Sequence, residues 1–500
     1  MGTLADLFYI EAKKHPKKVA VICETEKLTY EELAAKVSQF SSYFLQQGIS
    51  LGEHIGVPMT NSIESVALLM AAANIGAAIV PINPTLPIKQ VEQLFTEADV
   101  NHIVARGSFL KKFELSYMWN EIKTIICIDD ARFPLNLQVA QHEKVARPII
   151  KVSNNMPFII TMTSGSTGFP KPILLTQQDK LDRIYAHVDL YAINSDEIIL
   201  SGTPLYHSLA ERLVLMPLVI GATSVILPRF TPRLWLECVT NNKVTFTIAV
   251  SAQLAQIIKI LNEDNNLTSM RCLVSSSALL DEQVKQRLIN KINCEFHEMY
   301  GASEVSTVTS INFKEARRKN KSVGKPLKEA KVIILNDKGQ LCKSNEIGEI
   351  GCKTSLQCKG YYKRDEIFRQ SFYGDYFMTG DLGYLDEEGY LYFAGRKKEL
   401  IITGGINVYP PDIENCLLIL QEVLECAAVP YPDEKLGEIV AAVIVKSEEI
   451  DERTIRFHCA QNLADYQQPR KIIFVENLPK NSMGKVVKSE VGKLLVERYI

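Results

Sequence analysis

The chain has 500 residues, of which 46% are hydrophobic and 23% are charged, an ordinary globular composition with room for several domains. Its formal net charge is −2, so nothing global attracts nucleic acid or an anionic membrane surface. The eleven cysteines show no C-x-x-C pair and no Cys/His ligand spacing. Such cysteine usage favours a reducing compartment and argues against a structural zinc site, so we expect a cytoplasmic protein.

No transmembrane segment is expected. The N-terminal stretch lacks the basic region ahead of an apolar core that a signal peptide requires. The most apolar run, residues 66–81, is shorter than the ~20 residues of a transmembrane helix and contains Asn74, Gly76 and Pro81. We predict that this run forms a buried helix followed by a buried strand.

Short β-rich runs alternate with helical patterns over most of the chain. This alternation predicts an α/β fold in which helices cover layered β-sheets. The strands are expected at 77–84, 124–130, 158–166, 224–230 and 245–250, and helices at 89–98 and 281–292.

The pattern changes near residue 390, where turns, a basic run, a Gly-Gly pair and a Pro-Pro pair follow one another closely. Helices are then expected at 412–420 and 452–463, and strands at 425–431, 439–445 and 470–478. We predict a large N-terminal domain over 1–396 and a small, mobile α+β C-terminal domain over 397–500, joined by a short hinge.

Residues 161–172, TMTSGSTGFPKP, begin within the predicted strand at 158–166 and continue beyond its end. Glycines permit close backbone approach, and successive N–H groups form an anion-binding nest. The hydroxyl groups add donors and Lys171 adds a positive charge. The run is not a Walker loop, which needs G-x-x-x-x-G-K-[ST]. A plain Gly/Ser linker fits poorly, because linkers rarely follow a buried strand directly, so a phosphate-binding loop is the better interpretation.

The T-S-G-S-T-G-F-P-K segment resembles the phosphate loop of the adenylate-forming superfamily, which includes acyl-CoA synthetases, luciferases and peptide-synthetase adenylation domains. Nine further segments resemble that superfamily's signatures in the same order, and the closest likeness is to acyl-CoA synthetases. They are LTYEEL (28–33), GAAIVPINP (76–84), PLYHSL (204–209), MYGASE (299–304), SVGKPL (322–327), GEIGCK (348–353), YFMTGDLG (376–383), GRKKELIITGGINVYPPDIE (395–414) and NLPKNSMGKVVK (477–488).

The resemblance implies a nucleotide site. In it, Tyr300 offers a ring face to adenine, Asp381 accepts the ribose hydroxyls, Arg396 reaches ribose or phosphate, and Glu304 binds Mg²⁺, which prefers carboxylate oxygen. The full implied set is Thr163, Ser164, Gly165, Ser166, Thr167, Gly168 and Lys171 at the phosphates, with Ala278, Tyr300, Gly301, Ser303, Asp381 and Arg396 around the nucleoside.

The resemblance also implies catalytic and moving parts. Lys485 is similar to the lysine that bridges the attacking carboxylate and the α-phosphate, and His207 lines or gates the acyl pocket. Lys398 occupies the hinge position of the family. The Gly404-Gly405 pair would face the incoming thiol after the small domain rotates.

Several of these residues have a plainer interpretation. Glu304 is otherwise an exposed acid, Tyr300 a core residue, and Asp381 a turn-capping aspartate. An isolated Lys485 would be solvated, and His207 would be structural.

The chain also departs from the family pattern at several positions. Pro172 stands where the family has glycine, no histidine occurs within 174–178, and Ser275–Ser277 replaces the usual S-G-G. These changes predict an altered fit to the nucleotide and keep a non-catalytic interpretation open.

The expected activity is that of an ATP-dependent acyl-CoA synthetase that uses ATP, Mg²⁺ and CoA. The acyl segment PLYHSLAERL has no carboxylate at the position where amino-acid-activating relatives carry one, which favours a fatty or aromatic acid. Glu211 and Arg212 either pair with each other or bind a polar tail of the substrate. The alternatives are an acyl-AMP ligase that loads a separate carrier protein, a nucleotide- or acyl-binding pseudoenzyme, and a luciferase-type oxygenase.

Overall fold

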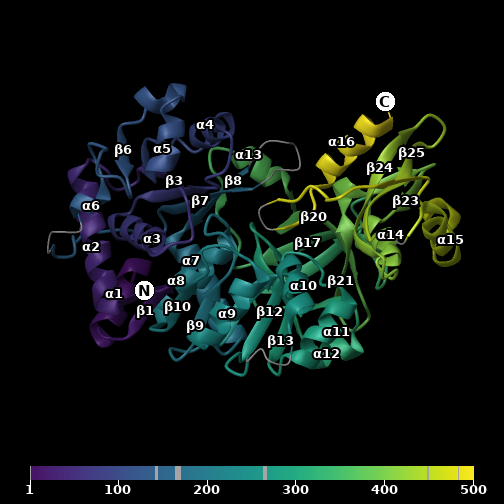
Figure 1. Cartoon of the computed structure of the whole chain (residues 1–500), viewed down its shortest axis with the longest axis horizontal. Helices are drawn as coiled ribbons and strands as arrows, with labels where there is room; N and C mark the ends of the chain where they lie inside the picture. Colours follow the sequence, from purple (N-terminus) through teal and green to yellow (C-terminus); the bar gives the residue numbers. More distant parts are fainter. Residues whose placement is uncertain are drawn as a thin grey trace. The chain divides into compact units, whose positions relative to one another are not determined.

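The computed structural model describes residues 2–140, 145–163, 171–262, 267–447, 450–481 and 484–499. The chain forms two compact units (Figure 1). Unit 1 comprises Met1–Arg318, Leu327–Ala330 and Lys353–Phe372, and unit 2 comprises Lys319–Pro326, Lys331–Cys352 and Tyr373–Ile500. The domain boundary that the sequence predicts, between 396 and 397, falls inside unit 2 and stays a prediction.

Unit 1 contains two sheets. In the described part of the chain, one has seven strands in the order β18-β8-β7-β4-β3-β5-β6. Its central strands are parallel, and β8 and β18 are antiparallel to their neighbours. The strands are β3 (His54–Pro58), β4 (Ala78–Ile82), β5 (His102–Ala105), β6 (Thr124–Cys127), β7 (Pro157–Thr163), β8 (Lys171–Thr176) and β18 (Gly360–Tyr361).

The second sheet of unit 1 has the order β2-β1-β10-β9-β11-β12-β13-β14, with parallel pairing from β1 to β13 and antiparallel hairpins at both ends. Its strands are β1 (Val19–Cys23), β2 (Glu26–Thr29), β9 (Ile198–Ser201), β10 (Thr223–Ile226), β11 (Phe246–Val250), β12 (Cys272–Ser276), β13 (Glu295–Ala302) and β14 (Ser306–Asn312).

Helices cover both sheets, as the alternating pattern predicts (Figure 1). They are α1 (Leu4–Lys14), α2 (Tyr30–Gln46), α3 (Ile63–Ile75), α4 (Ile88–Glu97), α5 (Gly107–Phe113), α6 (Leu137–Ala140), α7 (Gln177–Leu190), α8 (Ser208–Ile220), α9 (Pro232–Asn242), α10 (Ser251–Ile260), α11 (Glu282–Lys291), α12 (Phe313–Arg318) and α13 (Asp365–Gln370). A 3₁₀ turn spans Tyr117–Asn120.

The apolar run at 66–81 behaves as predicted. It forms most of α3, in which every residue except Glu64 is buried, followed by the buried strand β4. Gly76 ends the helix in the left-handed conformation at φ 72°, where a side chain would also collide with Leu51. Among the described residues, no helix has the length and apolar character needed to cross a bilayer.

Unit 2 carries the antiparallel strands β15, β17, β20 and β21, and a five-stranded sheet formed by β22 to β26 within its described residues. The elements predicted beyond residue 410 are confirmed, and α16 is an addition. The bounds are β15 (Ser322–Pro326), β16 (Ala330–Leu335), β17 (Gly348–Thr354), β19 (Phe372–Tyr373), β20 (Tyr376–Leu385), β21 (Leu391–Arg396), β22 (Ile401–Thr403), β23 (Ile406–Val408), α14 (Pro410–Leu417), β24 (Val423–Asp433), β25 (Gly437–Lys446), α15 (Glu452–Asn462), β26 (Lys471–Phe474) and α16 (Lys488–Tyr499), with 3₁₀ turns at Lys397–Glu399 and Asp465–Gln467.

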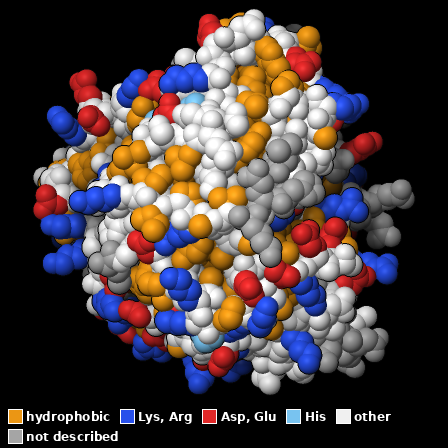
Figure 2. All heavy atoms as spheres, turned by 90° about the vertical axis from the view of Figure 1, so that its left-hand side faces the viewer, with side chains coloured by type: hydrophobic (Ala, Val, Ile, Leu, Met, Phe, Trp, Pro, Cys, Tyr) orange, Lys and Arg blue, Asp and Glu red, His pale blue; other side chains and the backbone are white. Residues whose placement is uncertain are grey.

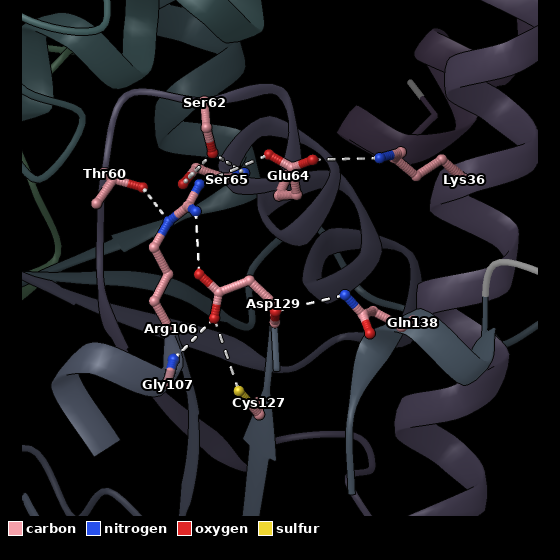
Figure 3. Close-up of polar contacts among 10 residues, drawn as sticks. All are labelled: Lys36, Thr60, Ser62, Glu64, Ser65, Arg106, Gly107, Cys127, Asp129 and Gln138. Carbon is pink, nitrogen blue, oxygen red and sulfur yellow. Dashed lines mark hydrogen bonds and ion pairs between the residues drawn. The ribbon is translucent and has the colours of Figure 1, made fainter. Parts of the chain in front are cut away.

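Charges of both signs are mixed on one face of the molecule (Figure 2). On the face drawn in Figure 2, lysine and arginine side chains alternate with acidic and apolar ones, and neither sign gathers into one broad patch. Figure 3 shows one such mixture in detail at the carboxyl ends of β5 and β6, where Arg106 lies 3.2 Å from Asp129 and 4.0 Å from Glu64. Lys36 completes the group, 3.4 Å from Glu64. Each cation there has an acidic neighbour.

Candidate active site

The predicted phosphate loop joins two antiparallel strands, β7 and β8. Residues 164–170, and with them Ser164, Gly165, Ser166, Thr167 and Gly168, lie outside the described residues, as does the side chain of Thr163. The strand ends are in register, with Thr163 opposite Lys171 and Met162 opposite Pro172. Pro172 is therefore a strand residue here, and its carbonyl accepts a hydrogen bond from the Tyr362 amide at 2.8 Å.

Glu304 is linked to Lys171 through Tyr361. The hydroxyl of Tyr361, on β18, donates to Oε1 of Glu304 at 2.9 Å. The Lys171 ammonium lies 5.1 Å from the centre of the same ring, within cation–π range. The hydrogen bond engages Oε1 of Glu304, and Oε2 is a second hard oxygen of the kind that Mg²⁺ prefers. The carboxylate thus fits the magnesium role that the resemblance implies.

Arg183, on α7, holds the chain around Glu304. Its guanidinium donates to three main-chain carbonyls, those of Leu356 (2.9 Å), Ser303 (3.1 Å) and Glu304 (3.1 Å). Arg183 is only 1% exposed, so these bonds replace its hydration. Neither Arg183 nor Tyr361 lies in a segment that resembles a family motif, because both act through contacts distant along the chain.

Tyr300 and Gly301 lie on β13 at an irregularity in its pairing with β14. Tyr300 is buried. A Cβ atom at Gly301 would approach the carbonyl oxygen of Ser306 to 2.0 Å, so only glycine fits there. The bulge re-aims the chain just before Ser303 and Glu304.

The segment that replaces the family's S-G-G comprises the last two residues of β12 and the residue after it. Ser251 holds it from α10, through hydrogen bonds to the carbonyls of Ser276 (3.2 Å) and Ala278 (2.5 Å). Ser277 has φ 76°, a left-handed conformation that glycine adopts without strain. The backbone thus retains the shape of a glycine-containing turn, although a serine occupies it.

His207 is the residue just before α8 and packs against Tyr206, with ring centres 4.6 Å apart. Burial lowers the pKa of the His207 imidazole to about 4, so the ring is neutral at physiological pH. A neutral ring at this position suits the lining of an acyl pocket better than it suits proton transfer.

Asp381 and Arg396 face each other on neighbouring strands of unit 2. They are register partners on β20 and β21, and Nε of Arg396 lies 3.3 Å from Oδ1 of Asp381. Asp381 is 6% exposed, whereas the Arg396 side chain is 41% exposed. The Asp381 carboxylate is therefore buried at the strand pair, and the Arg396 guanidinium is the more accessible group.

Lys485 belongs to a local turn in the same unit. The Asn481 side chain accepts from the Lys485 amide at 3.0 Å, and the Asn481 amide donates to the Lys485 carbonyl at 2.9 Å. Gly484 precedes the lysine at φ 76°, a conformation that favours glycine. Burial lowers the pKa of the Lys485 ammonium, the charge of Arg396 adds to this, and Glu399 and Asp381 partly oppose it. The lysine thus shares one electrostatic environment with Asp381 and Arg396.

The Gly404-Gly405 pair forms the two-residue turn between β22 and β23. Their φ values, 56° and 83°, are those of a type I′ hairpin turn, which favours glycine at both positions. Local turn geometry therefore accounts for both glycines, and their thiol-side role stays a prediction. Lys398 lies in the exposed 3₁₀ turn Lys397–Glu399, and its hinge role also stays a prediction.

One further group of potential metal ligands occurs among the described residues. The ligand atoms of Cys272, Glu295 and His297 all lie within 4.8 Å of one another. Spacing along the sequence does not reveal it, because β12 and β13 bring Cys272 beside Glu295. Burial raises the pKa of the Cys272 thiol to about 12 and disfavours the thiolate that binds metals. Arg271, 3.8 Å from Glu295, further weakens the case, and no metal is assigned.

The sequence matches known families over most of its length. The family model described as AMP-binding enzyme matches residues 8–362, and that of the AMP-binding enzyme C-terminal domain matches residues 412–485. The 2-succinylbenzoate–CoA ligase of Oceanobacillus iheyensis is 30% identical, over 96% of this chain and 97% of that protein. The uncharacterized acyl–CoA ligase YhfT of Bacillus subtilis is 28% identical, over 99% of each chain.

Solved structures agree with this assignment. ATP-bound MatB from Rhodopseudomonas palustris has a TM-score of 0.90 and 26% identity, covering 99% of this chain and 100% of that one. The o-succinylbenzoate CoA synthetase MenE from Bacillus subtilis, in complex with the acyl-adenylate OSB-AMP, has a TM-score of 0.87 and 25% identity over 97% of each chain. The chain therefore belongs to the AMP-binding enzyme family, the adenylate-forming superfamily that its motifs resemble, and is an ATP-dependent, AMP-forming acid–thiol ligase of the acyl-CoA synthetase type.

Proposed function

We propose that this ligase activates a fatty or aromatic carboxylic acid through the residues predicted from its motifs. The acid carboxylate attacks the α-phosphorus of ATP and pyrophosphate leaves. The thiol of CoA then attacks the acyl carbonyl and AMP leaves. The names of the relatives, 2-succinylbenzoate–CoA ligases, support an acid with an aromatic ring. The eleven cysteines are all free thiols, which supports a reducing cytoplasm as its location.

The observation that carries the assignment of roles is the shared environment of Lys485, Arg396 and Asp381. Adenylation spreads negative charge over phosphate oxygens, so catalysis depends on positioning and on preorganised positive charge. In this proposal, Asp381 holds the ribose, and the two cations meet the α-phosphate. A partly desolvated ammonium such as that of Lys485 gains most when an anion enters, because its lowered pKa then returns toward the ordinary value.

In unit 1, Glu304 would hold the Mg²⁺ that bridges and neutralises the phosphates of ATP. Tyr361 and Arg183 would keep that carboxylate and its main chain in position. Lys171 would bind the departing pyrophosphate. Tyr300 would offer its ring to adenine, and His207 would line the acyl pocket as a neutral ring.

The test is pyrophosphate release from Mg²⁺-ATP across a panel of carboxylic acids, with and without CoA. The panel runs from acetate through long-chain acids to benzoate and 2-succinylbenzoate. Release that rises sharply with CoA for one class supports the proposal and identifies the substrate. Release of about one equivalent, unchanged by CoA, points to a separate carrier protein as acceptor. ATP binding without release for any acid contradicts the proposal and favours a pseudoenzyme.

A further inference from the structure

A buried polar cluster lies between α7 and α8, which run side by side in unit 1 (Figure 1). Its members lie on facing sides of the two helices: Lys180, Arg183 and His187 on α7, and Glu211 and Arg212 on α8. All five are buried. Charged side chains are rarely buried without a pairing partner, so each charge in this α7–α8 cluster is expected to have one.

Two of the three cations in the α7–α8 cluster have polar partners that compensate for their burial. The Lys180 ammonium makes a short ion pair with the Glu211 carboxylate. The Arg183 guanidinium donates to the three main-chain carbonyls described above. Glu211, the residue next to Arg212 in the sequence, thus pairs with Lys180. The expectation that Glu211 and Arg212 pair with each other is not met.

Among the described residues, the third cation, Arg212, forms side-chain hydrogen-bond contacts with His187 alone. Its Nη1 lies 3.0 Å from Nε2 of the ring and 3.4 Å from Nδ1. Burial lowers the pKa of His187 well below its ordinary value, so the ring is neutral, and its Nε2 also lies 2.8 Å from the Thr307 hydroxyl. Arg212 therefore hydrogen-bonds to a neutral ring, and among the described residues no carboxylate forms an ion pair with it, although the charge of Glu211, which pairs with Lys180, acts on it.

Burial also acts on Arg212 itself. Desolvation, together with the charge of Arg183, lowers the pKa of the Arg212 guanidinium to about 9, and Tyr191 and Glu211 partly oppose this shift. The group still carries its charge at neutral pH. The cluster holds three cations and the single carboxylate of Glu211, which pairs with Lys180, so an entering anion would offset the buried positive charge of Arg212.

Arg212 lies at the acyl segment and is the most accessible member of the cluster. It stands within the first turns of α8, which begins directly after His207, and its helix neighbours include Leu209 and Leu213. Arg212 is 7% exposed, whereas the other four members are between 0% and 2% exposed. Its partner His187 contacts Thr307, which is opposite Gly301 in the β13–β14 register. The cation is thus tied to the strand segment that carries Tyr300 and Gly301 and that leads to Glu304.

We propose that Arg212 binds a second carboxylate at the far end of the acid substrate, and that the enzyme therefore acts on dicarboxylic acids. The inference rests on the proposed function, because it assigns the class of acid that the same site takes. A guanidinium matches a carboxylate through two parallel N–H···O bonds. One cation suits one anionic group, and the neighbouring leucines suit an apolar body between the two carboxyl groups.

The first test compares acids that differ only in a terminal carboxylate. The pairs are adipate with hexanoate, suberate with octanoate, and 2-succinylbenzoate with 4-oxo-4-phenylbutanoate. For the wild-type enzyme we expect kcat/KM to be roughly 10²-fold higher for the dicarboxylate of the preferred pair, as for a charged hydrogen-bonded pair in a desolvated site. Activity with all monocarboxylates equal to or above that with their partners would overturn the inference and leave the proposed function intact.

The second test uses Arg212→Met, which keeps the apolar stem, and Arg212→Lys, which keeps the charge without the planar fork. We expect Arg212→Met to abolish the dicarboxylate preference, with a smaller loss of kcat/KM for the monocarboxylate, and Arg212→Lys to restore part of the preference. Arg233→Met, an exposed arginine on α9, is the matched control and should keep the preference. An equal rise in KM for ATP with every acid would instead place a phosphate at Arg212 and contradict the inference.

A binding measurement separates the two proposals. Calorimetric titration of 2-succinylbenzoate into the full chain without ATP requires no turnover. Binding to the wild type that is lost in Arg212→Met, and is absent for 4-oxo-4-phenylbutanoate, supports the inference even if no acid releases pyrophosphate. Equal binding of both acids to the wild type and to Arg212→Met overturns it.

Discussion

The Tyr361 hydroxyl donates to Oε1 of Glu304 at 2.9 Å, across 57 residues of sequence. The Tyr361 ring also lies 5.1 Å from the Lys171 ammonium, so one buried side chain connects the candidate magnesium ligand with the candidate pyrophosphate ligand. Burial raises the pKa of Tyr361, and the nearby Glu304 carboxylate raises it further, so the phenol stays protonated as the donor. Tyr361 thus orients a carboxylate that the reaction needs in one position.

Tyr361→Phe should weaken the binding of Mg²⁺ more than it lowers the stability of the fold. A hydrogen bond to a charged group contributes about 1.5 kcal/mol or more, so the apparent Mg²⁺ requirement should rise roughly tenfold. The measurement is the rate of acyl-AMP formation as a function of Mg²⁺ at fixed ATP. Tyr362→Phe is the matched control, because the Tyr362 hydroxyl donates to Asp99 instead. Equal Mg²⁺ dependence in both variants would show that Tyr361 does not position Glu304.

Arg183→Met should destabilise unit 1. It leaves three carbonyls, of Leu356, Ser303 and Glu304, without their donor, and we expect unfolding to become easier by about 2–4 kcal/mol. Urea unfolding followed by fluorescence measures this change. Arg233→Met, in which the lost side chain is 85% exposed, should stay within about 0.5 kcal/mol of the wild type. Similar losses in both variants would contradict the structural role.

The sequence predicts well those features that one segment encodes by itself. The apolar run at 66–81 specifies a helix and a strand, since its length and its Gly76 and Pro81 exclude a membrane span. The strands and helices beyond residue 410 follow in the same way from local periodicity. Helix α16 is not among the predicted elements, although it begins at Lys488, where the lysine motif ends.

Contacts between distant segments are what sequence reasoning could not supply. Arg183 reaches Ser303 across 120 residues, and nothing around position 183 marks it as a site residue. Glu211 and Arg212 are a second example. Whether they pair with each other depends on the positions of Lys180 and His187 on α7, which the sequence does not give. By contrast, the left-handed turn at Ser277 could be expected, since the family places glycine in that segment.

Ser277→Gly should stabilise the chain or leave it unchanged, and should improve nucleotide binding. The left-handed φ of 76° costs a serine about 1 kcal/mol, which glycine avoids, although glycine also gains freedom in the unfolded chain. Ser276→Gly is the control: Ser276 is buried in β12, so its loss should destabilise. Urea unfolding and ATP titration measure the two effects. A clear loss of stability in Ser277→Gly would mean that the hydroxyl, and not the backbone, dominates there.

His207 should make stability depend on pH below neutrality. Burial lowers its pKa to about 4 in the folded state, against about 6.5 when unfolded. Between these values the unfolded chain binds the extra proton, so stability falls as pH decreases from about 6.5 to about 4 and levels off below. The contribution is at most about 3 kcal/mol. His207→Gln should reduce the slope in this window. An unchanged slope would show that His207 protonates normally, with other buried histidines such as His187 responsible.

Lys485→Ala should separate the two half-reactions. Removing a preorganised cation from the α-phosphate should slow acyl-AMP formation by roughly 10²–10³-fold, whereas thioester formation from supplied acyl-AMP and CoA should persist. Lys480→Ala is the matched control, because Lys480 pairs with Glu425 at the surface of the same unit. Single-turnover measurements of acyl-AMP and of acyl-CoA follow the two steps independently. If adenylation continues at the wild-type rate in Lys485→Ala, the charge at the α-phosphate comes from another residue, and Arg396, beside Asp381, becomes the first to replace.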